Sequence, residues 1–97
     1  MNFILAPSAT RDLDQLSEYY FNTNVEAGEK LFTLLNQRFE QLTKFPHLGK
    51  PYPHLDPSIR GLIAGKHIIF YRVTQDQVEI VRIVQGQQDL NKFFNPN

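Results

Sequence analysis

The C-terminal half of the chain contains three short runs rich in β-branched and aromatic residues, and two turn signals separate them. The runs cover residues 60–64, 67–74 and 77–84. Gly65-Lys66 fits a two-residue hairpin turn with glycine in its first position, and Gln75-Asp76 fits a second turn. Connections this short join neighbouring antiparallel strands. The pattern therefore predicts a three-stranded antiparallel meander, which the rest of the chain must cover or extend.

Two-residue loops also fix the register of this meander, because each strand residue then has a defined neighbour on the next strand. The expected cross-strand pairs, in chain order, are Arg60–Tyr71, Leu62–Ile69, Ile69–Arg82, Tyr71–Ile80 and Arg72–Glu79. The last of these joins opposite charges and is an attractive contact of modest strength. The register decides which side chains share a face.

The two faces of the expected sheet differ in chemistry. The face that we expect helices to cover carries Ile63, Ile68, Phe70, Val81 and Ile83. The opposite face sets four basic or aromatic residues among branched aliphatics, namely Arg60, His67, Tyr71 and Arg82. A small domain rarely leaves so much apolar surface in water. Either a partner that is partly apolar and partly anionic binds there, or the C-terminal tail fills this face with Phe93 and Phe94.

The N-terminus predicts a brief strand and a first helix. Residues 3–5 form a short apolar run that ends before Pro7. Ser8 is a natural N-cap, because its hydroxyl can accept a hydrogen bond from a free helix amide. Apolar side chains then recur at helical spacing, which predicts a helix over residues 9–21.

A second amphipathic helix follows closely. Thr23 and Glu26 have the spacing of a capping box, and an apolar stripe continues to Lys44 before Pro46 ends the helix. Two amphipathic helices joined by a few residues bury their stripes as an antiparallel hairpin. Residues 45–58 contain four prolines and are expected to form a loop.

Together these elements predict a single α+β domain over residues 1–97, with a short N-terminal strand, an antiparallel helix hairpin and a three-stranded antiparallel meander. There is no cysteine, so thiolate metal sites are excluded. His47 and His54 stand in the proline-rich loop without companion ligands, and we expect no metal and no cofactor. Without a signal peptide or a long apolar run, the expected location is the cytoplasm, with no membrane partner.

Charge is distributed unevenly although the formal net charge is zero. Residues 1–43 carry six acids against three bases, whereas residues 44–97 carry seven bases against four acids. This polarity suggests a partner that meets the second half and is itself acidic. A chance asymmetry in a small protein is the alternative interpretation.

Several segments of the chain recur in a known order and spacing, and they are residues 8–13 (SATRDL), 45–50 (FPHLGK), 59–62 (IRGL), 66–73 (KHIIFYRV) and 78–90 (VEIVRIVQGQQDL). No single motif is diagnostic, but their order and spacing are together specific. In these segments and in the order of its elements, the chain resembles the RelE/ParE superfamily of toxins, and within it the ParE-like branch of plasmid stabilisation proteins. The resemblance implies a type II toxin whose cognate antitoxin wraps and blocks it.

Members of this superfamily differ in their target, since the RelE branch cuts messenger RNA on the ribosome and the ParE branch poisons DNA gyrase. RNA cleavage needs a proton acceptor, a proton donor and cations for the phosphorane charge. The resemblance matches Arg60 and Arg82 to basic positions of the RNase cluster. Where many relatives carry His-Gly-Arg-Arg-Asp, however, residues 85–89 read Gln-Gly-Gln-Gln-Asp. Glutamine cannot relay a proton, and the tail offers Phe93 and Phe94 in place of a phenol.

The leading hypothesis is therefore a gyrase-binding inhibitor with no chemistry of its own and no direct sequence-specific nucleic-acid binding. The alternatives are a ribosome-dependent endoribonuclease of the RelE type and a degenerate member that only binds its antitoxin. His67 has a suitable pKa for a base, but beside a turn it is expected to be an ordinary surface histidine. The candidates for partner contact are Arg60, His67, Tyr71, Arg82, Phe93 and Phe94.

Overall fold

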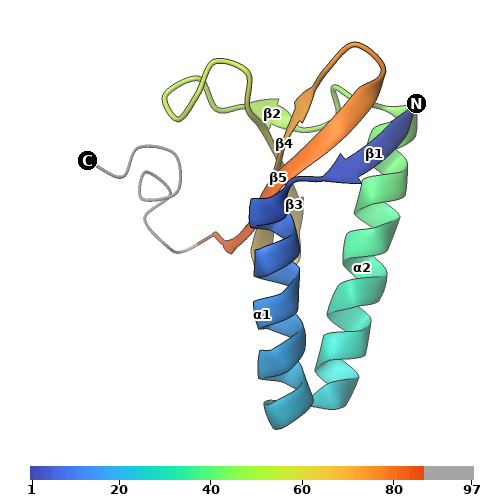
Figure 1. The fold of residues 1–97 in the computed structure, drawn as a ribbon, viewed down its shortest axis with the longest axis vertical. Helices are drawn as coiled ribbons and strands as arrows, with labels where there is room; N and C mark the ends of the chain where they lie inside the picture. The colour runs from blue at the N-terminus through green and yellow to red at the C-terminus, as the bar shows by residue number, and fades with distance from the viewer. Residues whose placement is uncertain (87–97) are drawn as a thin grey trace.

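A computed structural model describes residues 1–86 of the 97-residue chain. A five-stranded mixed sheet with strand order β1-β5-β4-β3-β2 packs against an antiparallel pair of helices (Figure 1). In chain order the elements are β1 (Asn2–Leu5), α1 (Pro7–Thr23), α2 (Val25–Lys44), β2 (Lys50–Pro51), β3 (Arg60–Ala64), β4 (His67–Val73) and β5 (Gln77–Gln85). The α+β class, the helix hairpin and the antiparallel meander of β3, β4 and β5 are thus confirmed.

Both predicted turns of the meander are present. Gly65 has φ of +61°, a left-handed conformation that glycine adopts without steric conflict, and Ala64 pairs with His67 across it. At the second turn, Val73 pairs with Val78. Four of the five predicted cross-strand pairs are confirmed, and they are Arg60–Tyr71, Leu62–Ile69, Tyr71–Ile80 and Arg72–Glu79.

The predicted pair Ile69–Arg82 is wrong. Ile69 pairs with Ile83, and Arg82 pairs with Phe70. The cause is a β-bulge in which Val81 is an extra residue on β5, without an opposite number on β4. One extra residue shifts every later side chain of β5 to the other face.

The prediction of the helix-covered face is also wrong for Ile68, Phe70 and Val81, whereas Ile83 lies on that face as predicted. Helix side chains of α1 and α2 pack against Ile69, Tyr71, Val78, Ile80 and Ile83, which form the main core. The bulge brings Ile83 onto this face.

The opposite face is covered by the loop that precedes β3. Leu55 and Ile59 of that loop form a second core cluster, whose sheet residues are Ile68, Phe70 and Val84. The loop before β3, and not the helices, therefore covers this face. The prolines of that loop did not indicate that it packs on the sheet.

Two edge strands extend the predicted meander. The apolar run at the N-terminus pairs in parallel with β5, with Phe3 opposite Val78 and Leu5 opposite Ile80. At the other edge, Lys50 and Pro51 pair with β3. The predicted N-terminal strand is confirmed, but the sheet is mixed and has five strands.

The helix boundaries differ from those predicted by one turn at most. Ala6 is the N-cap of α1 and Pro7 occupies its first turn, where a missing N–H has no consequence. Ser8 does not cap the helix. Its hydroxyl instead donates a hydrogen bond of 2.6 Å to the carbonyl oxygen of Val81, and so fastens the start of α1 to the bulge in β5.

The predicted capping box at Thr23 is absent as well. The Thr23 hydroxyl donates to the carbonyl of Tyr19 within α1, and the side chain of Asn24 accepts from the amide of Ala27 at the start of α2. The helices approach closely near this turn, because a β-carbon on Gly28 would lie 2.6 Å from the β-carbon of Tyr20. The antiparallel hairpin follows from this contact and from the shared core.

Candidate functional site

A buried ion pair joins α1 to β5 beside the bulge. The Arg82 guanidinium donates from Nε to Asp12 Oδ2 at 2.8 Å and from its terminal nitrogen to Asp12 Oδ1 at 2.9 Å. Asp12 Oδ2 also accepts the backbone N–H of Ile83 at 2.9 Å. Asp12 is only 8% exposed, so its charge is stabilised by these three donors and little by water. This carboxylate holds the first helix on the last strand.

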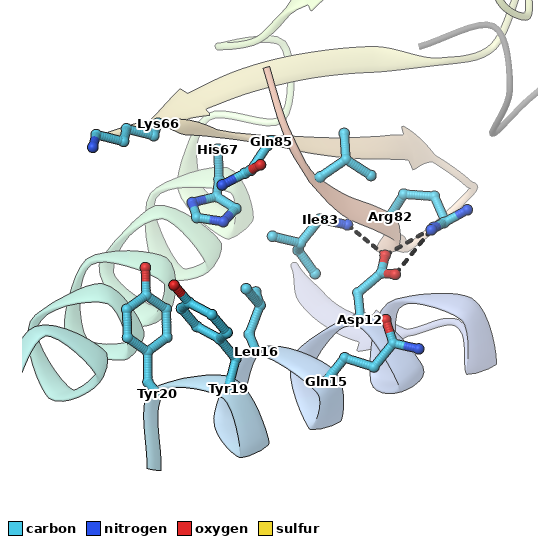
Figure 2. Close-up of a pocket in the computed structure, with 11 residues that line it drawn as sticks. Asp12, Gln15, Leu16, Tyr19, Tyr20, Lys66, His67, Arg82, Ile83 and Gln85 are labelled. Carbon is cyan, nitrogen blue, oxygen red and sulfur yellow. Dashed lines mark hydrogen bonds and ion pairs between the residues drawn. The ribbon is translucent and has the colours of Figure 1, made fainter. Parts of the chain in front are cut away.

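The ion pair forms one wall of the principal pocket of the described residues, which has a volume of about 720 Å³. Its walls come from α1, from the start of β4 and from the end of β5. Figure 2 shows Tyr19 and Tyr20 rising from α1 with their hydroxyl groups pointing toward His67. The lining residues are Asp12, Gln15, Leu16, Tyr19, Tyr20, Lys66, His67, Arg82, Ile83, Val84 and Gln85.

His67 is the unusual member of this pocket. Its side chain is 4% exposed, and neither ring nitrogen has a hydrogen-bond partner within the part of the chain that the structure describes. Burial lowers the pKa of the imidazole below 6.5, so the ring is neutral at pH 7. The expectation of an ordinary surface histidine is therefore wrong. Its place at the first residue of β4, directly after a turn, concealed the fact that it lies on the helix-covered face of the sheet, which Ile69 and Tyr71 share.

Burial of this histidine makes stability depend on pH. Because the folded-state pKa lies below the unfolded value of 6.5, the unfolded chain takes up the proton more readily as pH falls. The stabilising contribution is complete above pH 6.5 and is lost as pH falls through the folded pKa. We expect the free energy of unfolding to decline toward pH 5 by at most about 1.4 kcal/mol per pH unit from this group. The variant His67→Phe should flatten that decline, and exposed His54→Gln should leave it unchanged. Parallel slopes for wild type and His67→Phe in urea titrations would contradict the account.

Tyr71 and Arg60, the other two candidates within the described strands, hold a loop in place. The Tyr71 hydroxyl donates to the carbonyl of Pro46 at 2.7 Å and accepts the N–H of Gly49 at 2.9 Å. Arg60 donates to the carbonyl of Gly49 at 2.7 Å. Burial raises the pKa of Tyr71, so the hydroxyl keeps the proton that it donates. Tyr71 is fully buried, and it lies on the helix-covered face and not on an open one.

The structure thus separates the candidates into two groups. His67 and Arg82 line the same pocket, whereas Arg60 and Tyr71 meet at the loop of residues 46–49. Phe93 and Phe94 lie outside the described residues. Sequence reasoning missed Tyr19, Tyr20 and Lys66 as pocket residues. Only the tyrosine pair could have been identified from the sequence. Adjacent residues of a helix point in different directions, so one of the two tyrosines had to lie outside the core.

A second surface feature lies at the tip of the helix hairpin. A mainly apolar hollow there is lined by Ser17, Tyr20, Phe21, Val25, Gly28, Glu29 and Phe32. Phe21 is 78% exposed and Val25 is 52% exposed. Exposed large apolar side chains grouped in this way are typical of protein-binding surfaces.

Two classes of site are not found within residues 1–86. No group of three or more histidine, aspartate or glutamate side chains there is arranged to hold a metal ion. Both helices of this described part are also too short or too polar for the hydrocarbon layer of a bilayer.

The fold is shared with a known class of proteins. It superposes on a solved chain of the chromosomal ParDE toxin–antitoxin system from P. aeruginosa with a TM-score of 0.73, covering 88% of this chain and 95% of that one at 22% identity. The architecture is therefore that of a ParDE protein.

The sequence comparisons identify the family. The family model described as the ParE toxin of type II toxin-antitoxin systems, parDE, matches residues 3–90. The chain is 26% identical over 92 residues to Toxin ParE1 of Mycobacterium tuberculosis, covering 93% of this chain and 94% of that protein. It is 31% identical over 81 residues to Toxin ParE1 of Caulobacter vibrioides, covering 82% and 83% respectively. The chain belongs to the ParE toxin family of type II toxin–antitoxin systems.

Proposed function

We propose that this protein is a toxin that inhibits DNA gyrase by binding to it, and that a cognate antitoxin neutralises it. The supporting observation is the state of Arg82. A guanidinium that stabilises a phosphorane must direct its charge toward the phosphate. Arg82 instead directs two nitrogens to Asp12 and is neutralised by that carboxylate. In this proposal Arg82 has a structural role, and the protein inhibits its target by binding and not by catalysis.

The composition supports a protein target over a nucleic acid. A protein that binds DNA or RNA through phosphates carries a basic surface. Here ten basic residues are balanced by ten acidic ones. Gyrase acts on chromosomal DNA, so the proposed place of action is the cytoplasm.

We propose that the antitoxin binds two surface features of this protein, the apolar hollow at the tip of the helix hairpin and the edge strand β1. An amphipathic helix would place apolar side chains in the hollow at the hairpin tip, next to Phe21 and Val25. A strand of the antitoxin would add to β1, which stands at one end of the strand order.

The proposal predicts a direct effect on purified gyrase. Pure protein should inhibit gyrase supercoiling or cause gyrase–DNA cleavage complexes to accumulate, and added antitoxin should reverse the effect. Gyrase that remains fully active at a large molar excess of this protein would contradict the proposal.

One observation favours the alternative of a RelE-type endoribonuclease. The pocket places a neutral imidazole near two phenols, a lysine and Arg82, which are groups that RNA cleavage can use. Against it, Arg82 is already paired with Asp12. Primer extension on ribosome-bound messenger RNA decides the question, because this alternative requires cuts at defined codon positions. A degenerate member would bind its antitoxin but leave growth unaffected when it is induced in a bacterial host.

A further inference from the structure

The pocket between α1 and the strand ends is rich in hydrogen-bond donors. Tyr19 and Tyr20 contribute hydroxyl groups that point toward His67 (Figure 2), and Lys66, whose side chain extends away from His67 in this view, contributes an ammonium group, which donates only, at the rim. Gln15 and Gln85 add carboxamides at the edge of the pocket. Such a set of donors is suited to a ligand group that accepts several hydrogen bonds.

The charge of the pocket also favours an anion. Asp12 is the only acidic residue among those that line it, and its oxygens already accept from Arg82 and from the N–H of Ile83. Lys66 has no acidic partner within 4.0 Å in the described part of the chain. The lining residues therefore carry one net positive charge when His67 is neutral.

His67 is the residue of this pocket whose polar atoms have no hydrogen-bond partner among the described residues. Buried polar atoms in folded proteins nearly always have a hydrogen-bond partner, and an exception needs a physical reason. Both nitrogens of this ring lack one among residues 1–86. A ligand group that enters the pocket beside Lys66 can provide that partner.

We propose that this pocket binds a carboxylate, supplied by an aspartate or glutamate side chain of the antitoxin; the identity of the supplier rests on the proposed function. A carboxylate accepts hydrogen bonds at two oxygens, as the donor set requires. Leu16, Ile83 and Val84 also line the pocket, so the acidic side chain belongs to a segment that is otherwise apolar. One unpaired ammonium is too little positive charge for a nucleic-acid backbone, which binds through many cations.

Access to the buried ring requires only side-chain movement at the edge of the pocket. Tyr19 is 59% exposed, and Gln85 is exposed as well. Exposed side chains change rotamer within picoseconds to nanoseconds. These two residues can therefore move aside for a ligand without a change in the backbone.

Carboxylate binding is coupled to proton uptake in this arrangement. The titratable groups that share the pocket with His67 are Asp12, Tyr19 and Tyr20 from α1, Lys66 from the turn and Arg82 from β5. Asp12 is compensated by Arg82, so an entering carboxylate becomes the negative group that acts on the ring. It favours the imidazolium, which donates from both nitrogens. Affinity for the carboxylate should therefore increase as pH falls, approaching tenfold per pH unit.

The test uses the full chain with ¹⁵N-labelled histidine and sodium butyrate as the probe, at constant ionic strength. We expect saturable shifts of the His67 ring resonances and a rise in its titration midpoint. Neutral butyramide should produce neither effect, and inorganic phosphate should produce a smaller one. Absence of saturation with butyrate, an equal response to butyramide, or a larger response to phosphate would overturn the carboxylate assignment.

Two variants test the residues separately. Lys66→Met should weaken butyrate binding about fivefold, whereas Lys44→Met at the end of α2 should have no effect. His67→Phe should remove the pH dependence of binding, and His54→Gln should retain it. Because the wild-type titration needs no variant, a variant that fails to fold leaves the proposal testable. An unchanged butyrate affinity in folded Lys66→Met would contradict the role of Lys66.

The antitoxin is tested by calorimetry in two buffers of different ionisation enthalpy. The cognate full-length antitoxin should bind with net proton uptake at pH 7, and uptake should be lost with His67→Phe. Binding without uptake would overturn the antitoxin as the source of the carboxylate. A failure of the antitoxin to bind at all would contradict the proposed function and not the butyrate result.

Discussion

Replacement of Asp12 by alanine is expected to lower the free energy of unfolding by about 2 kcal/mol, less than is typical of a fully buried ion pair, because the Arg82 side chain is 22% exposed. The guanidinium of Arg82 would lose both of its carboxylate contacts, and the N–H of Ile83 would lose its acceptor. Urea unfolding monitored by circular dichroism measures the change. The matched control is Asp14→Ala, since Asp14 is exposed on the same helix.

The reason for this expected loss can be tested with a second substitution. If the penalty arises from an uncompensated charge, the double variant Asp12→Ala/Arg82→Met should be more stable than Asp12→Ala alone. Stability of Asp12→Ala within about 0.5 kcal/mol of wild type, the range of ordinary surface substitutions, would show that the pair does not hold α1 on β5.

The second large effect is expected at Tyr71. Removal of its hydroxyl in Tyr71→Phe leaves the carbonyl of Pro46 and the N–H of Gly49 without their partner. Each unsatisfied buried group costs about 1–3 kcal/mol, and because the loop can admit water we expect a total near 2 kcal/mol. Thermal and urea unfolding measure it. The control is Tyr19→Phe, whose hydroxyl lies on an exposed side chain. Equal stability of the two variants would mean that Tyr71 does not fasten the loop.

The secondary structure was largely predictable because its signals are local. Apolar spacing predicted both helices, and Gly65-Lys66 predicted a turn whose geometry then set most of the register. The bulge at Val81 was not predictable, because neither it nor Arg82 carries a local signal such as glycine. Because of that single extra residue, the side chains that follow it on β5 lie on the opposite face relative to β4 from the one predicted.

The candidate site depended on contacts between distant parts of the chain, which periodicity does not report. No local pattern around Asp12 indicates its partner, because Arg82 lies 70 positions away in the chain. His67 looked exposed because it follows a turn, but it is buried on the same face of β4 as Ile69 and Tyr71. The family resemblance was more informative than either residue, since it used order and spacing along nearly the whole chain, and the match to residues 3–90 confirmed it.

The central claim is that this toxin-family protein acts by binding gyrase and not by catalysis. A titration of purified protein against several gyrase concentrations in a supercoiling assay tests it most directly. For an inhibitor that binds tightly, the amount required for half inhibition rises in proportion to the gyrase present, and an equimolar amount of antitoxin restores activity. Full gyrase activity throughout, together with site-selective message cuts by catalytic amounts of the protein on programmed ribosomes, would contradict the claim.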